Sequence, residues 1–155
     1  MQKVSPSYTL LILSLSSPIL LGVYRDGTLI EKIESEKKTS DILLPVITEL
    51  MDRYPVSSMI YTRGPGSYMA IKLTYIILRT IEIIKNIPFW GCSAFALNGN
   101  KPVKAMGNLY FVKEKETIIT QKFDQMIPQK FELPSSLATL AIDEVSTPNY
   151  VLPAV

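Results

Sequence analysis

Residues 58–85 of this 155-residue chain read SMIYTRGPGSYMAIKLTYIILRTIEIIK, and this stretch decides the fold. It begins with a short apolar run, Ser58 to Thr62, which enters the glycine-rich loop Arg63-Gly64-Pro65-Gly66-Ser67. A segment without glycine or proline follows, from Tyr68 to Lys85. The pattern predicts a strand, a tight turn and a long helix, which together are typical of an α/β protein.

Three strands are predicted before this stretch. The runs Leu10 to Leu15, Ile19 to Tyr24 and Thr28 to Ile33 are short and apolar or alternating, and Asp26-Gly27 is a strong hairpin signal between the last two. Glu34 to Lys38 then reads as a charged loop. Three strands of antiparallel type therefore open the chain.

A first helix is predicted from Ser40 to Tyr54. Thr39, Ser40 and Asp41 are N-cap candidates, Pro45 is expected in the first turn, and Pro55 ends the helix. The apolar residues after the cap recur at helical spacing: Ile42, Leu43, Val46, Ile47, Leu50, Met51 and Tyr54.

The rest of the chain carries weaker signals. Pro88 to Gly91 predicts a short strand, and Asn98 to Asn108 reads as a linker. Leu109 to Lys113 and Thr117 to Lys122 predict a hairpin, whereas Phe131 to Val155 shows little periodicity. We therefore expect a first lobe over residues 1–97 and a reduced second lobe over residues 98–155.

Composition excludes several classes of function. The chain is 47% hydrophobic with a net charge of +2, which supports a folded core and gives no case for strong nonspecific nucleic-acid binding. It has no histidine, which excludes His-dependent catalytic sites and any zinc site that contains histidine, whereas carboxylate chemistry and magnesium binding stay open. Its one cysteine, Cys92, is expected to be a small buried apolar residue. A lone cysteine fits a reducing cytosol. The apolar stretch Tyr8 to Tyr24 is broken by Ser16-Ser17-Pro18, so neither a signal peptide nor a membrane span is expected.

The glycine loop Arg63 to Ser67 leaves two interpretations open. Backbone N–H groups between a strand and a helix can bind an anion, but the loop has neither the Walker lysine nor the third glycine of a dinucleotide fingerprint. The alternative is a tight turn in which Gly64 and Gly66 adopt angles closed to other residues and Ser67 caps the helix.

The helix after the loop has a wider apolar face than packing against one sheet requires. On a helical wheel its polar residues, with Lys72, Arg79 and Glu82 among them, form one narrow stripe, and the apolar arc spans about 200 degrees. Covering one sheet requires about 100 degrees or somewhat more. Either the first helix and the sheet bury the excess, or it belongs to an interface with another protein. The candidate partner-binding residues on the two helices are Ile42, Leu43, Val46, Ile47, Leu50, Leu73, Ile76, Ile77, Ile81 and Ile84.

The motif Y-T-R-G-P-G-S-Y-M-A-I-K, Tyr61 to Lys72, resembles the signature G-R-G-P-G-S-[FY]-T-G-[LV]-R of the TsaB (YeaZ) family. Thr39-Ser40-Asp41 with Leu43-Leu44-Pro45 is similar to the family's H-S-x-x-L-L-P. Lys104 to Tyr110 and Pro148 to Val151 resemble its D-A-R-x-G-E-V-Y and late P-x-Y-L stretches. The resemblance covers most of the chain and is weakest after Phe123.

This resemblance implies an actin/Hsp70/RNase H-like (ASKHA) lobe with a reduced second lobe. It also implies a cytoplasmic, non-catalytic scaffold that binds TsaD through its two first-lobe helices, with the ATPase TsaE joining the assembly. That assembly attaches threonylcarbamoyl to the adenosine beside the tRNA anticodon, so tRNA would be an indirect partner. No catalytic residue, cofactor or metal site is predicted.

Departures from the family pattern bear on nucleotide chemistry. The family retains D-T-S after the first strand, where this chain has Ser14-Leu15-Ser16-Ser17 without a carboxylate. Thr39 and Ala70 replace the family's histidine and glycine, and Lys104 and Met106 replace the charged residues of D-A-R. Two alternatives stay open: a small ATPase or sugar-kinase-like enzyme of the same fold, and a homodimeric structural protein. Tyr68, Tyr75 and Tyr110 could stack on RNA, although packing is the simpler expectation.

Overall fold

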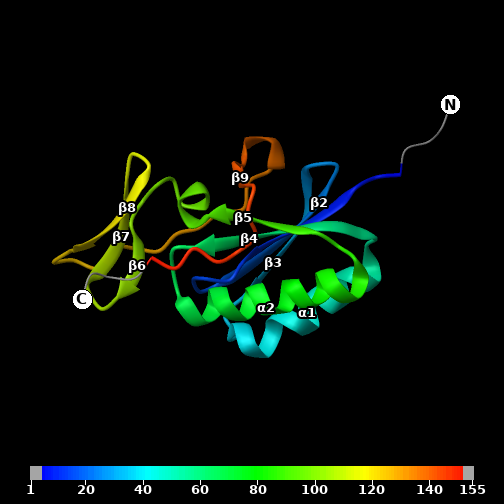
Figure 1. The fold of residues 1–155 in the computed structure, drawn as a ribbon, viewed down its shortest axis with the longest axis horizontal. Coiled ribbons are helices and arrows are strands. Elements are labelled where there is room, and N and C mark those ends of the chain that lie inside the picture. The colour runs from blue at the N-terminus through cyan, green and yellow to red at the C-terminus, as the bar shows by residue number, and fades with distance from the viewer. Residues whose placement is uncertain (1–4, 152–155) are drawn as a thin grey trace.

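The computed structural model describes residues 5–151, which form two β-sheets and two long helices (Figure 1). The main sheet has six strands in the order β3-β2-β1-β4-β5-β9, and the second has three in the order β6-β7-β8. In chain order the elements are β1 (Tyr8–Leu13), β2 (Ile19–Arg25), β3 (Thr28–Ser35), α1 (Thr39–Arg53), β4 (Val56–Gly64), α2 (Tyr68–Lys85), β5 (Phe89–Ser93), the 3-10 turn η1 (Ala94–Leu97), β6 (Val103–Met106), β7 (Leu109–Glu114), β8 (Thr117–Lys122), the 3-10 turn η2 (Leu137–Thr139) and β9 (Ile142–Asp143).

The central strand β1 joins the antiparallel and parallel halves of the main sheet. It pairs antiparallel with β2 and parallel with β4, and β4 pairs parallel with β5. The β2–β3 connection turns at Asp26 and Gly27, both with positive φ, as a tight hairpin requires. The predicted strands and hairpin are therefore present, with ends that differ by at most two residues.

The two helices lie on one side of the main sheet, and residues 131–140 run across the other (Figure 1). On that second side the Tyr24 hydroxyl donates to the Pro134 carbonyl at 2.6 Å, and Leu133 packs over β2. Gly22 is needed at this point, because a Cβ there would lie 2.8 Å from the Tyr24 ring and 3.1 Å from Leu133. Both faces of the sheet are therefore covered.

The second sheet lies beyond the start of α2, and the chain then returns to the first sheet (Figure 1). The return is fixed by backbone bonds from Glu132 to Leu97 and from Leu29 to Ser135. The lobe boundary near residue 97 stays a prediction. Residues 131–151 return to the main sheet, and at their end Tyr150 and Val151 line a cavity together with Phe111 of the second sheet.

Several sequence predictions need correction. Pro45 lies in the second turn of α1 rather than the first, and the N-cap is Lys38, which makes no side-chain cap bond. The predicted linker contains β6, and β9 and η1 were not predicted, because short elements without periodicity depend on distant partners. The apolar stretch Tyr8 to Tyr24 forms most of β1 and β2. Within residues 5–151 no helix has the length and apolar character needed to cross a bilayer.

We predict that Leu50→Ala destabilises the protein by about 2–5 kcal/mol, because Leu50 is fully buried between α1 and the sheet. Urea unfolding at equilibrium measures this as a lower midpoint. The matched control is Ile84→Ala on α2, where the side chain is exposed and the change should stay within about 0.5 kcal/mol. Equal losses in both variants would contradict the burial assigned here.

Cys92 is predicted to be unreactive in the folded protein. It is fully buried, and burial, with a smaller contribution from Asp143, raises the pKa of its thiol to about 12. Because the thiolate is the reactive form, a disulfide reagent at about pH 8 should label Cys92 only after unfolding. Rapid labelling of the native protein, monitored against the same reaction in urea, would show that the site opens.

Candidate functional site

The buried stripe of α2 is narrow. Ser67 begins the helix, since its Oγ accepts a hydrogen bond from the Ala70 amide at 3.4 Å, and Asn86 ends it in the left-handed region. The residues buried against the sheet and α1 are spaced three or four apart: Ile71, Thr74, Leu78 and Ile81. This stripe accounts for only part of the apolar circumference.

The remaining apolar residues of α2 face outward. Ile83 and Ile84 are 74% and 73% exposed, Ile76 is 49% exposed, and Met69 near the helix start is also exposed. Leu44 on α1 adds to them. We call these five residues the exposed helix face. In a single chain this surface is exposed to water. The first helix and the sheet therefore do not bury the whole apolar arc of α2, which leaves the interface with another protein as the alternative.

The predicted partner-binding residues fall into three groups. Four are buried in the core, where they pack against the sheet and cannot touch a partner without rearrangement: Leu43, Ile47, Leu50 and Ile81. Four are half-buried: Ile42, Val46, Leu73 and Ile77. Only Ile76 and Ile84 are exposed. The candidate surface is therefore narrower than the sequence suggested, because helical spacing identifies an apolar arc but not the part of it that meets the sheet.

Three exposed residues were missing from the predicted set: Leu44, Met69 and Ile83. The signal for Ile83 was available, since it lies seven residues after Ile76 and fourteen after Met69, on the same side of a helix. Leu44 follows the buried Leu43, and its outward direction depends on the orientation of α1 on the sheet.

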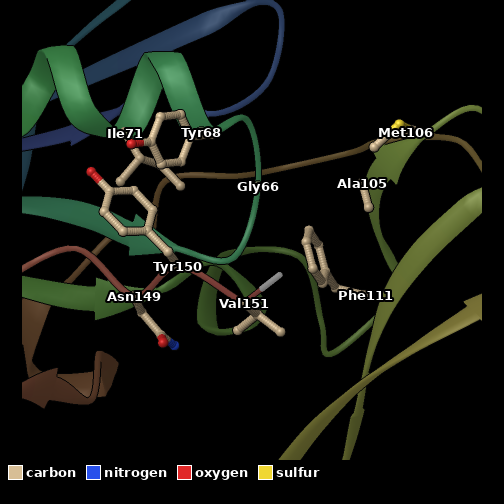
Figure 2. A pocket seen from close by; sticks show the side chains of 9 residues that line it. All are labelled: Gly66, Tyr68, Ile71, Ala105, Met106, Phe111, Asn149, Tyr150 and Val151. Carbon is tan, nitrogen blue, oxygen red and sulfur yellow. The ribbon is translucent and has the colours of Figure 1, made fainter. Parts of the chain in front are cut away.

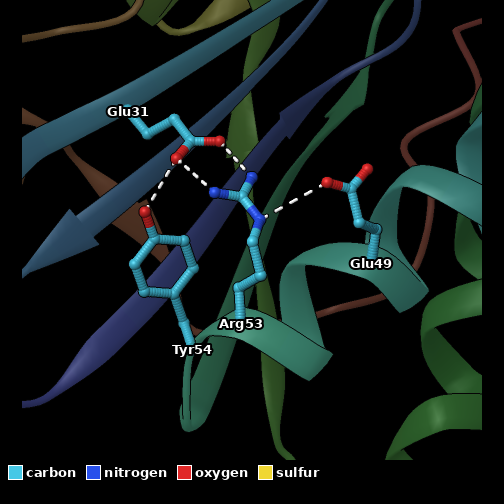
Figure 3. A network of polar contacts seen from close by, with 4 residues as sticks. All are labelled: Glu31, Glu49, Arg53 and Tyr54. Carbon is cyan, nitrogen blue, oxygen red and sulfur yellow. Dashed lines mark hydrogen bonds and ion pairs between the residues drawn. The ribbon is translucent and has the colours of Figure 1, made fainter.

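A polar network connects the end of α1 to the edge strand β3 (Figure 3). Arg53 donates to Glu31 on β3 at 2.9 Å, and the Tyr54 hydroxyl donates to the same carboxylate at 2.7 Å. Both hydrogen bonds lower the pKa of the Glu31 carboxyl, and the bond from Arg53 contributes more than the bond from Tyr54. Glu49 adds an ion pair to Arg53 at 3.4 Å. The network ties the last turn of α1 to the sheet.

The glycine loop is packed against the C-terminal part of the chain. Arg63 Nε donates to the Thr147 carbonyl at 2.7 Å, its Nη1 lies 3.1 Å from Asp143 Oδ2, and its own carbonyl accepts from Asn149. Gly64 has φ +136°, and a Cβ there would collide with the Asn149 carbonyl. The predicted tight turn and Ser67 cap are confirmed, and the Arg63 side chain is engaged within the protein.

The turn after β1 is held by hydroxyl contacts. Ser14 Oγ lies 2.6 Å from Thr74 Oγ1 on α2, and Thr74 donates to the Ala70 carbonyl at 2.8 Å. Beside this turn, a hollow of about 290 Å³ is lined by the serines of the turn and by the start of α1. Residues 5–151 contain no group of three or more cysteine or acidic side chains placed to hold a metal ion.

The three tyrosines considered for RNA stacking are engaged in packing. Tyr110 is buried and its hydroxyl accepts from the Ile127 amide at 3.0 Å. Tyr75 packs against Phe89 with ring centroids 5.9 Å apart. Tyr68 is half exposed but packs against Tyr150, with ring centroids 4.5 Å apart and the rings tilted by 40°. Their arrangement matches the packing interpretation.

Comparison with known proteins finds similar solved structures but no similar family model or curated sequence. No protein-family model matches the chain, and neither does any curated protein. The structure of YeaZ from Pseudomonas aeruginosa matches with a TM-score of 0.62 at 12% identity, over 80% of this chain and 71% of that one. A crystal structure of an uncharacterized protein with similarity to peptidase YeaZ, from the same organism, matches with a TM-score of 0.61 over the same shares and at the same identity. The predicted fold class is confirmed: the chain has the actin/Hsp70-like α/β fold of the YeaZ structures, in a shorter and divergent form.

Proposed function

We propose that this chain is a TsaB-like scaffold subunit that binds a TsaD-like protein through the exposed helix face. In that role it supports threonylcarbamoylation of the adenosine beside the tRNA anticodon, with a TsaE-like ATPase in the assembly and tRNA as an indirect partner. The observation that carries the proposal is the outward direction of Ile76, Ile83 and Ile84 on a YeaZ-like fold.

The exposed helix face has the chemistry of a helix-packing surface. On α2 Met69, Ile76 and Ile83 recur at spacings of seven, so they form a ridge along one side of the helix, and Ile84 follows Ile83 at its end. Full burial of an isoleucine side chain is worth about 1.5–3 kcal/mol, so a partner helix covering three of them gains enough to offset part of the cost of association. Arg79 and Glu82 pair with each other at the side of the ridge.

A scaffold role without chemistry of its own is part of the proposal. The chain has no histidine, and its one cysteine is fully buried, so a Ser-His or Cys-His nucleophile cannot be assembled from its residues. The turn after β1 offers serine hydroxyls where nucleotide-using relatives carry a carboxylate.

We predict that Ile84→Asp and Ile76→Asp weaken binding to the TsaD-like protein of the same genome by at least about 30-fold, because a charge would be buried at the centre of the contact. Calorimetry and size exclusion with light scattering measure the affinity and the stoichiometry. Since both side chains are exposed, the variants should unfold at close to the wild-type urea midpoint.

The control is Ile30→Asp on β3, because Ile30 is 46% exposed, much like Ile76, but belongs to the edge strand and to neither helix. It should bind as the wild type does. Normal binding by both helix variants would contradict the proposal, as would a homodimer that the TsaD-like protein does not displace. ATP turnover by the purified chain alone, abolished by a change at Gly66, would favour an enzyme instead.

A further inference from the structure

The C-terminal segment, residues 142–151, forms a strap over one edge of the main sheet. It begins as β9, which pairs antiparallel with β5 through Gly91 and Cys92. It then leaves the sheet, and its backbone carbonyls become acceptors for the first lobe. The Tyr61 hydroxyl donates to Ser146 at 2.6 Å, and the Gly91 amide donates to Val145 at 3.2 Å.

Arg63 holds the middle of the strap. Its guanidinium reaches two strap residues at once, Thr147 through a carbonyl and Asp143 through a carboxylate. The side chain of Arg63 is 17% exposed and that of Asp143 is 37% exposed, so the arginine is the more buried member of the ion pair. A charge held in this way is costly once its partner is lost, which makes the contact sensitive to either residue.

The end of the strap reaches the first turn of α2 (Figure 2). The Asn149 amide donates to the Arg63 carbonyl at 2.7 Å, and the Tyr150 ring packs against Tyr68, the first residue of the helix. In Figure 2 Tyr150 and Val151 lie between this turn and Phe111 of the second sheet. Together they border a cavity of about 170 Å³.

The start of α2 has weak local support of its own. The Ser67 cap bond is long, at 3.4 Å, and the first turn contains no acidic residue to favour the helix dipole. The same turn contains Met69, a member of the exposed helix face. The first turn of α2 is therefore weakly stabilised by its own residues, and contacts from the strap can stabilise it further.

We propose that the strap positions the glycine loop and the first turn of α2, residues 64–73, and so sets the geometry of the exposed helix face. Arg63 is the positioning residue, acting through Asp143 and Thr147 without touching a partner. The link to partner binding rests on the proposed function, whereas the effect on residues 64–73 does not.

The test compares local hydrogen exchange and partner binding in Arg63→Ala, Arg63→Lys and Asp143→Asn. In the free Arg63→Ala protein, amides of residues 64–73 should exchange about tenfold faster or more, and the Kd for the TsaD-like protein should rise about 5- to 30-fold. Arg63→Lys keeps the charge but loses the two-pronged contact, so it should lie between Arg63→Ala and the wild type. Asp143→Asn removes the charge of the pair but keeps a side-chain oxygen that can accept from Arg63, so its effect should be smaller than that of Arg63→Ala.

The control is Arg53→Ala, which removes another arginine paired with a carboxylate, at the far end of α1. It should speed exchange near its own turn and leave residues 64–73 unchanged. Gly64→Ala disturbs the strap from the other side, by steric contact with Asn149, and serves if Arg63→Ala does not fold.

Two results would overturn the inference: unchanged exchange over residues 64–73 in both Arg63→Ala and Gly64→Ala, or faster exchange with an unchanged Kd. If the wild type itself does not bind the TsaD-like protein, the proposed function fails. The exchange experiment then decides by itself whether the strap holds the start of α2.

Discussion

The burial of β1 on both faces is the constraint on which the rest of the fold depends. Leu10, Leu11, Ile12 and Leu13 are all fully buried, although successive side chains of a strand point to opposite sides of a sheet. Each side of the main sheet must therefore carry a cover. The helices α1 and α2 supply one, and η1 with residues 131–140 supplies the other. The C-terminal part of the described chain is committed to this task.

The same constraint explains why α2 is divided between core and surface. One helix covering one sheet uses about 100 degrees of its circumference, and α1 lies along only one of its sides. Leu78 and Ile81 meet the sheet side, whereas Ile83 and Ile84, two and three residues further on, turn into water. Nothing in residue type separates these pairs. Their different burial follows from the helix period and from the limited area that a single sheet can cover.

The sequence allowed the order of strands and helices to be predicted as far as Gly91, and the β7–β8 hairpin after it, because these elements have strong periodicity or clear turn residues. It did not reveal which apolar residues of α1 face inward, so Leu43, Ile47 and Leu50 were assigned to a partner surface although they belong to the core. It also missed β6 and β9, which are stabilised by pairing with strands elsewhere in the chain. The Arg63–Asp143 pair spans 80 residues, a separation at which no local pattern indicates a contact.

The glycine loop shows how one motif can serve a different purpose when its surroundings change. A strand, a glycine turn and a helix start present amides that could receive an anion, and sequence spacing alone left that open. Here the backbone of Asn149 lies against Gly64, and the guanidinium of Arg63 is directed to Asp143 and Thr147. Residues 131–151 thus form one continuous cover: the first half closes the open face over Gly22, and the second half closes the β5 edge and the loop. This cover ends where Tyr150 packs against Tyr68 of α2. Residues 131–151 therefore complete the core on one face of the main sheet and also contact α2, which lies on the opposite face.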